Sequence, residues 1–283
     1  MIYDEAKHYQ SIYVSDLDGT LFDNRGKISN EGARIINALI RNGMNFTVAT
    51  AKSYNSIKNE LNKLDLRLPV ITFDGAHVCQ PDGSTLLMQS LPLEQELKVA
   101  SVLDALNVNI LVYKLQENNT GKSVFMKVNK DDNFIETYLK KRKNDRRLSI
   151  VSDPVFEKHL PTAFIATIGS YDDILYISSV LTKHCIYNFY INADTYISGM
   201  YWLKISNEKA KKSFAIKEIM SIFGFKSLTT FGDSENDIDM LMQSNRKIVV
   251  SNASPALQKI ADEVIGDNNS NSVAYYLREK WRC

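Results

Sequence analysis

The chain has few of the residues that mark disulfide-rich, zinc-binding or membrane-spanning proteins. Its 283 residues include three cysteines, Cys79, Cys185 and Cys283, which are too far apart for a CxxC or Cys/His metal spacing. A disulfide framework or zinc site is therefore not expected, and reduced thiols suit a cytoplasmic protein. The first residues are polar and no apolar run reaches about 18 residues, so we expect neither a signal peptide nor a membrane span.

Charge of one sign is also not in excess. Lysine and arginine number 34 against 33 acidic residues, which gives a formal net charge of +1 and no electrostatic footprint for nucleic acid. The basic run 140–143 lacks interleaved aromatic residues and falls at the end of a predicted helix, where cations are favourable anyway. We expect no nucleic-acid or membrane partner, and a monomer or weak homodimer that binds a small molecule.

Strand and helix patterns alternate near both ends of the chain, which favours an α/β fold. The first part has a βαβαβ order, whose right-handed crossovers predict parallel strands: strands 12–15, 44–49 and 70–73, with helices 29–41 and 54–64. The last part returns to this rhythm near Trp202, with helices 210–223, 234–243 and 273–279 and strands 227–231 and 247–250.

The middle of the chain has shorter and less regular strands. Its predicted elements are helices 93–106, 134–143 and 172–183, strands 108–114, 124–128, 164–168 and 187–191, and a turn at 118–121. We therefore predict a Rossmann-like core with a parallel sheet, made of residues 1–78 and 195–283, and an inserted α+β domain of residues 79–194.

Two carboxylates stand directly after the first predicted strand, in the segment Asp16-Leu17-Asp18-Gly19-Thr20-Leu21. The carboxyl ends of strands are where open α/β sheets bind ligands. Burying paired acids there costs free energy unless a cation or a reaction uses them. Other strand ends and helix starts contribute Thr50, Lys212 and the segment 232–237, so these groups are expected to converge.

This set of groups suits phosphoryl transfer. A carboxylate such as Asp16 can attack phosphorus, provided that the negative charge on both partners is neutralised. Mg²⁺ usually takes one or two carboxylates with water and phosphate oxygens, and Asp16 with Asp233 would supply them. Asp18 could protonate the leaving oxygen and later activate water. We therefore expect Mg²⁺ as cofactor and a small phosphorylated substrate.

These segments resemble the four motifs of the haloacid dehalogenase (HAD) superfamily: Asp16-x-Asp18-Gly19-Thr20-Leu21, Thr50, Lys212 and Gly232-Asp233-x-x-Asn236-Asp237. The insertion resembles the type IIB cap of the Cof-type subgroup, and Phe73-Asp74-Gly75-Ala76 is similar to the segment before that cap. The resemblance extends over nearly the whole chain. It implies a HAD core and a cap domain, at residues 79–194, that sets substrate specificity.

The resemblance also implies a role for each matching residue. Asp16 would be the nucleophile and a Mg²⁺ ligand, and Asp18 the general acid/base that binds Mg²⁺ through its backbone carbonyl. Asp233 and Asp237 would bind Mg²⁺. Lys212, selected by spacing over its neighbouring lysines, would orient the nucleophile.

Three residues are expected to bind the substrate, namely Thr50, Asn236 and Lys52. Lys52 stands where the subgroup usually has arginine, Asp74 where it has asparagine, and Ser213 where it has glycine. The resemblance implies a phosphomonoester hydrolase that acts on sugar phosphates through an aspartyl-phosphate. A phosphosugar mutase with the same nucleophile and a catalytically weak phosphometabolite-binding protein are the alternatives.

Overall fold

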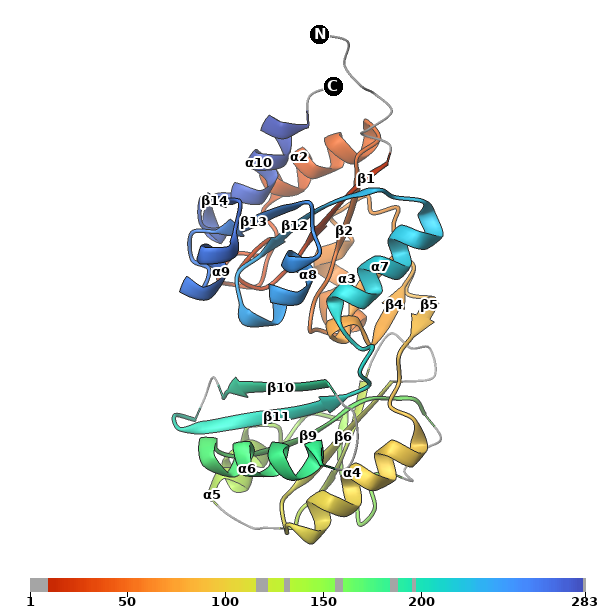
Figure 1. Cartoon of the computed structure of the whole chain (residues 1–283), viewed down its shortest axis with the longest axis vertical. Coiled ribbons are helices and arrows are strands. Elements are labelled where there is room, and N and C mark those ends of the chain that lie inside the picture. Colours follow the sequence, from red (N-terminus) through yellow and green to blue (C-terminus); the bar gives the residue numbers. More distant parts are fainter. Residues whose placement is uncertain are drawn as a thin grey trace. The chain divides into compact units, whose positions relative to one another are not determined.

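The structure is a computed structural model, and it describes residues 10–115, 122–129, 133–155, 160–183, 188–194 and 197–281. Its contacts divide the chain into two compact units, Met1–Met88 with Lys211–Cys283, and Gln89–Ala210. Figure 1 shows the elements of both units. The predicted turn at 118–121 lies outside the described residues.

The division falls at other residues than the boundaries that the sequence suggested. β3 (Val70–Thr72), β4 (His77–Cys79) and β5 (Thr85–Met88) form an antiparallel sheet, which keeps residues up to 88 in the first unit. β11 (Met200–Ser206) pairs with strands of the second unit. Trp202, where the sequence suggested a return to the core, therefore lies in the second unit.

The first unit is built on a five-stranded sheet in which every pair is parallel, in the order β14-β13-β12-β1-β2. The strands are β1 (Ser11–Ser15), β2 (Asn45–Val48), β12 (Ser227–Gly232), β13 (Arg246–Val250) and β14 (Glu263–Ile265). The α/β class with a parallel sheet is thereby confirmed. Among the described residues, β3 joins this sheet through one isolated parallel bridge, between Ala49 and Ile71, while its ladder runs with β4.

Helices cover both faces of this sheet (Figure 1). They are α2 (Asn30–Arg41), α3 (Tyr54–Leu61), α7 (Lys212–Phe223), α8 (Ile238–Met242), α9 (Pro255–Ile260) and α10 (Ser272–Lys280). Ile12 and Val14 of β1 pack with α7, whereas Tyr13 points to the other face and contacts Trp281. Alternate residues of β1 are thus buried on both sides, as in parallel sheets generally.

The second unit is an α+β arrangement around a six-stranded sheet, in the order β10-β11-β9-β6-β7-β8. Its strands are β6 (Ile110–Leu115), β7 (Lys122–Lys127), β8 (Leu148–Ile150), β9 (Thr162–Ser170), β10 (Asn188–Ala193) and β11. α4 (Leu93–Ala105) and α6 (Tyr171–Thr182) pack on one face, and α5 (Asn133–Lys141) on the other. Among the described helices, none is both long and apolar enough to cross a membrane.

Candidate active site

Strand register brings the two acidic segments together. Asp16 directly follows β1, and Asp233 directly follows β12. β1 and β12 are parallel neighbours with Ser15 opposite Phe231, and the Asp16 amide donates to the Phe231 carbonyl at 2.9 Å. Both strands therefore end at the same edge of the sheet, where their following acids meet.

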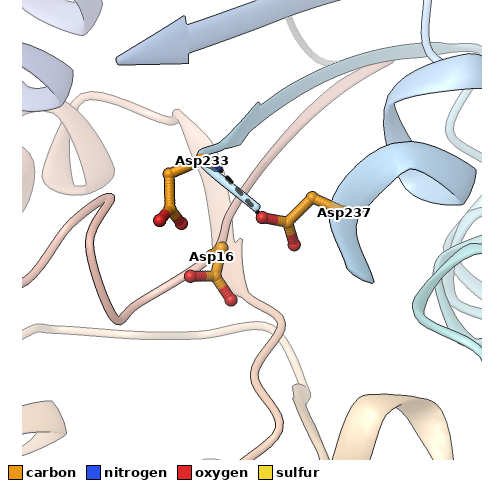
Figure 2. Close-up of side chains that lie close together, drawn as sticks. All are labelled: Asp16, Asp233 and Asp237. Carbon is orange, nitrogen blue, oxygen red and sulfur yellow. Dashed lines mark hydrogen bonds between the residues drawn. The ribbon is translucent and has the colours of Figure 1, made fainter. Parts of the chain in front are cut away.

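Three carboxylates form one cluster at this edge (Figure 2). Oxygens of Asp16, Asp233 and Asp237 all lie within 4.8 Å of one another. Asp237 Oδ2 accepts hydrogen bonds from the backbone amides of Asp233 at 3.1 Å and Ser234 at 3.3 Å. These bonds fix the Asp237 side chain at the end of a 3₁₀ turn, Glu235–Asp237, which precedes α8 and replaces the first turn of the predicted helix.

Lys212 lies between two of these acids. It is the first residue of α7 and is fully buried, and its Nζ is 2.6 Å from Asp16 Oδ1 and 2.7 Å from Asp237 Oδ1. Burial alone would lower the Lys212 pKa, but the carboxylates of Asp16 and Asp237 raise it well above its ordinary value. The ammonium therefore stays charged, and it holds one oxygen of Asp16 in place.

The cluster has more negative charge than Lys212 balances. Burial raises the pKa of Asp16 well above its usual range, and the nearby Asp237 charge adds to the rise. Burial also raises the pKa of Asp233 to about 6, again with a contribution from Asp237. A bound divalent cation would remove this repulsion, and oxygen ligands are those that Mg²⁺ prefers. The donor set therefore fits Mg²⁺.

Glycine is required where the backbone comes close to the acids. Gly19 has φ +77°, and a Cβ there would collide with Asp233 Oδ2. The absence of that Cβ lets Thr20 Oγ1 donate to Asp233 Oδ1 at 2.9 Å. Thr20 was not among the predicted site residues, although its position in the first motif could have indicated a role beside Asp16.

Asp18 and Lys52 meet each other rather than the cluster. Lys52 Nζ is 2.5 Å from Asp18 Oδ1, and both side chains are nearly half exposed. Thr50 ends the segment after β2, and its buried hydroxyl accepts from the Lys52 backbone amide at 3.1 Å. The structure thus links three residues with predicted roles, while their contacts with substrate stay predictions.

Asn236, one residue before Asp237, contacts Asp74 of the segment after β3. Asn236 Nδ2 donates to Asp74 Oδ1 at 3.3 Å, and the Asp74 amide donates to the Thr50 carbonyl at 2.9 Å. Asp74 is buried in a left-handed conformation with φ 54°, which is uncommon outside glycine. This local backbone therefore ties Asn236 and Thr50 to one another through Asp74.

Comparisons with known proteins agree with these motifs. A family model described as haloacid dehalogenase-like hydrolase matches residues 13–277. A protein of Buchnera aphidicola subsp. Baizongia pistaciae, named as a candidate phosphatase, is 27% identical over 274 residues, covering 95% of this chain and 97% of that protein. The 5-amino-6-(5-phospho-D-ribitylamino)uracil phosphatase YitU of Bacillus subtilis is 22% identical over 283 residues, covering 97% and 98%.

A solved structure has the same backbone fold. BT1666 from Bacteroides thetaiotaomicron, described among the phosphatases of its superfamily, superposes with a TM-score of 0.78. The match covers 98% of this chain and 97% of that one at 17% identity. At this identity the likeness concerns the fold alone.

Proposed function

This chain belongs to the haloacid dehalogenase-like hydrolase family, as a Cof-type member, and from that premise we propose that it is a Mg²⁺-dependent phosphatase of small phosphomonoesters. One observation carries the proposal. The buried Asp16 carboxylate stands at a strand end, 2.6 Å from the Lys212 ammonium, with Asp233 and Asp237 oxygens within 4.8 Å. A carboxylate so placed suits nucleophilic attack on phosphorus.

Mg²⁺ would be held by the carboxylates of Asp16, Asp233 and Asp237 and by the backbone carbonyl of Asp18. When bound it supplies positive charge that offsets the charge of the acids and of the substrate phosphate. The raised pKa values of Asp16 and Asp233 support this assignment, because burial and, to a smaller extent, the neighbouring Asp237 charge both disfavour their ionised forms, and a cation would offset this.

Each of the site residues then has its own role in the reaction. Asp16 attacks the phosphorus atom and forms an aspartyl-phosphate, while Asp18 gives its proton to the departing alcohol oxygen. The Asp18 carboxylate next takes a proton from water, whose oxygen attacks phosphorus and releases inorganic phosphate, and Asp16 is regenerated. Lys212 orients Asp16, while Thr50, Asn236 and Lys52 bind the phosphate or its neighbouring groups.

The substrate class and setting are part of the same proposal. Sugar phosphates and related phosphorylated metabolites are the substrates we favour, since the named substrate of the YitU relative carries its phosphate on a ribityl chain. We also propose that the inserted domain selects the substrate. A cytoplasmic monomer or weak homodimer is the setting we favour, consistent with a buried free thiol at Cys79.

The test is hydrolysis of p-nitrophenyl phosphate in the presence of Mg²⁺. Asp16→Asn should lower kcat by at least about 10³-fold, because the amide is a poor nucleophile. Asp262→Asn is the control and should leave kcat unchanged. Asp262 directly precedes β14 and pairs with Lys247 near the start of β13, whereas the acidic cluster lies where the strands end. An unchanged rate in Asp16→Asn would overturn the nucleophile assignment.

A second assay separates hydrolase from mutase. Hexose phosphates should release inorganic phosphate without forming isomeric phosphates. Isomer formation without phosphate release would instead identify a mutase, and inactivity across sugar phosphates, nucleotides and cofactor phosphates would favour a binding protein.

A further inference from the structure

Two hydrogen bonds join Ser213 of α7 to Asp239 of α8 and to Gln243, which directly follows α8. Ser213 Oγ donates to Asp239 Oδ2 at 2.7 Å, and Gln243 Nε2 donates to the Ser213 carbonyl at 2.6 Å. Asp239 and Gln243 are four residues apart, so they lie on the same side of α8. We call Ser213, Asp239 and Gln243 the α7–α8 clamp.

The clamp lies beside the charged contacts of the site. Ser213 directly follows Lys212, and Asp239 comes two residues after Asp237. Lys212 Nζ reaches across from α7 to Asp237 Oδ1 at 2.7 Å and to Asp16 Oδ1 at 2.6 Å. The starts of α7 and α8 therefore carry both the Ser213–Asp239 bond and the ion pairs, and a shift of one helix against the other would move Lys212 Nζ.

The start of α7 is also closely packed against Gly75. Gly75 has φ +99°, and a Cβ at that position would collide with the Lys211 carbonyl oxygen. Backbone against backbone leaves the first turn of α7 no room to move toward Gly75. The clamp supplies a further restraint, because its bonds oppose a movement of the α7 start away from α8.

The clamp also has a cost in stability. Asp239 Oδ1 is buried and has no hydrogen-bond partner among the described residues. A buried oxygen without a partner destabilises the folded state.

We propose that Ser213 and Asp239, assisted by Gln243, are positioning residues that fix the Lys212 ammonium between Asp16 and Asp237. This role rests on the proposed phosphatase function. Misplacing a catalytic group by about 1 Å can cost about 10²-fold in rate, so loss of one clamp bond should reduce turnover measurably. Substrate affinity should change little, because Lys212 holds the nucleophile.

The experiment compares clamp variants on p-nitrophenyl phosphate with Mg²⁺. Ser213→Ala and Asp239→Ala should each lower kcat about ten-fold with KM within about two-fold, and the double variant should fall no further, because both changes remove the same bond. Ser213→Thr keeps the hydroxyl and should restore most of kcat.

Two controls separate positioning from general damage. Ser170→Ala removes a hydroxyl–carboxylate pair of the same length, Ser170 Oγ to Asp173 Oδ2 at 2.7 Å, at the start of α6. It should leave kcat unchanged. In a Lys212→Ala background, Ser213→Ala should cause no further loss, because the group that the clamp positions is gone.

Each outcome bears on the proposal. An active enzyme whose kcat is unaffected by Ser213→Ala would overturn the clamp alone, as would an equal loss of kcat in the Lys212→Ala background. A wild-type protein that hydrolyses no phosphomonoester would overturn the proposed function, and the role of the clamp with it.

Discussion

Each of the two units buries a lysine among acceptors, yet the charges around the two lysines differ. In the first unit, Lys212 is fully buried and contacts the carboxylates of both Asp16 and Asp237. In the second unit, Lys114 of β6 is 2% exposed, and its Nζ is 3.3 Å from Glu96 Oε1. Thr162 Oγ1 also donates to Glu96 Oε1. One site has more acids than bases, whereas the other pairs one acid with one base.

This difference shows what marks a reactive site. Burial raises the pKa of Glu96, as it does for Asp16, so a shifted pKa does not distinguish the two places. The Lys114 pair is nearly neutral as it stands and needs no further ion. The surplus of carboxylates around Lys212, at the ends of parallel strands, favours a bound cation, and so points to chemistry.

Among the changes that test this comparison, the largest expected effect comes from Lys212→Met. Losing the ammonium leaves Asp16 without its positioning contact, so kcat on p-nitrophenyl phosphate should fall about 10²–10³-fold. Unfolding by denaturant without Mg²⁺ should also show a loss of about 3–5 kcal/mol, because two buried acids lose their partner. Unchanged turnover would contradict the assignment of Lys212 to the nucleophile.

Lys114→Met tests the other side of the comparison. It leaves Glu96 buried without a cation, which should cost about 3 kcal/mol of unfolding free energy, while kcat on p-nitrophenyl phosphate stays unchanged. Replacing Glu96 by Met as well should recover most of the stability, because the pair then becomes apolar. A turnover defect as large as that of Lys212→Met would remove the distinction between the two lysines.

His77 provides a third buried group, one that is kept neutral. Its ring nitrogens lie 3.1 Å from the hydroxyls of Thr72 and Thr85, and burial lowers its pKa to about 4. The unfolded chain, with a histidine pKa of about 6.5, binds this proton at higher pH than the folded chain. The His77 contribution to stability is therefore complete above that pKa, and about 3 kcal/mol should be lost as pH falls to 4.

Denaturant unfolding between pH 7 and 4 measures this loss. His77→Gln should flatten the pH dependence over that window, since its side chain does not titrate. An equally steep profile in His77→Gln would assign the loss to other groups.

Mg²⁺ binding should give the smallest change in the free energy of unfolding, and only acids of the first unit should contribute to it. At about 100 times its Kd, the ion should raise the free energy of unfolding by about 2.7 kcal/mol, and Asp233→Asn should reduce this gain by removing a ligand charge. Calorimetry of both proteins with and without Mg²⁺ measures it. An equal gain in Asp233→Asn would place the ion elsewhere.

The sequence predicted the acidic cluster well because its cause is local. Each acid follows a short apolar strand, and parallel strands end at one edge, so Asp16 and Asp233 could be brought together without knowing any contact. Motif spacing likewise selected Lys212, which the structure places against Asp16 and Asp237. The helix from the Ser29 cap to Arg41 also followed from local signals and is confirmed, with Ser29 accepting from the Gly32 amide.

What could not be predicted depends on packing between distant segments. β11 reads in sequence as a return to the core, yet its partners β9 and β10 assign it to the second unit. The Ser213–Asp239 bond exists because α7 packs on α8, and no periodicity in either helix reveals it. Glu96 looks in sequence like an ordinary acid in the first turns of a helix, and only the fold buries it against Lys114.

The position of β1 in its sheet has a consequence for how the protein is made. Asp16 and its partner Lys212 are separated by 196 residues, which a ribosome adds in about 10–40 s at about 5–20 residues per second. Until then β1 lacks β12, and one edge of a strongly apolar strand stays without its neighbour. We expect the nascent chain to depend on chaperones during this interval, because unpaired strand edges promote aggregation, and to acquire its catalytic centre only near the end of translation.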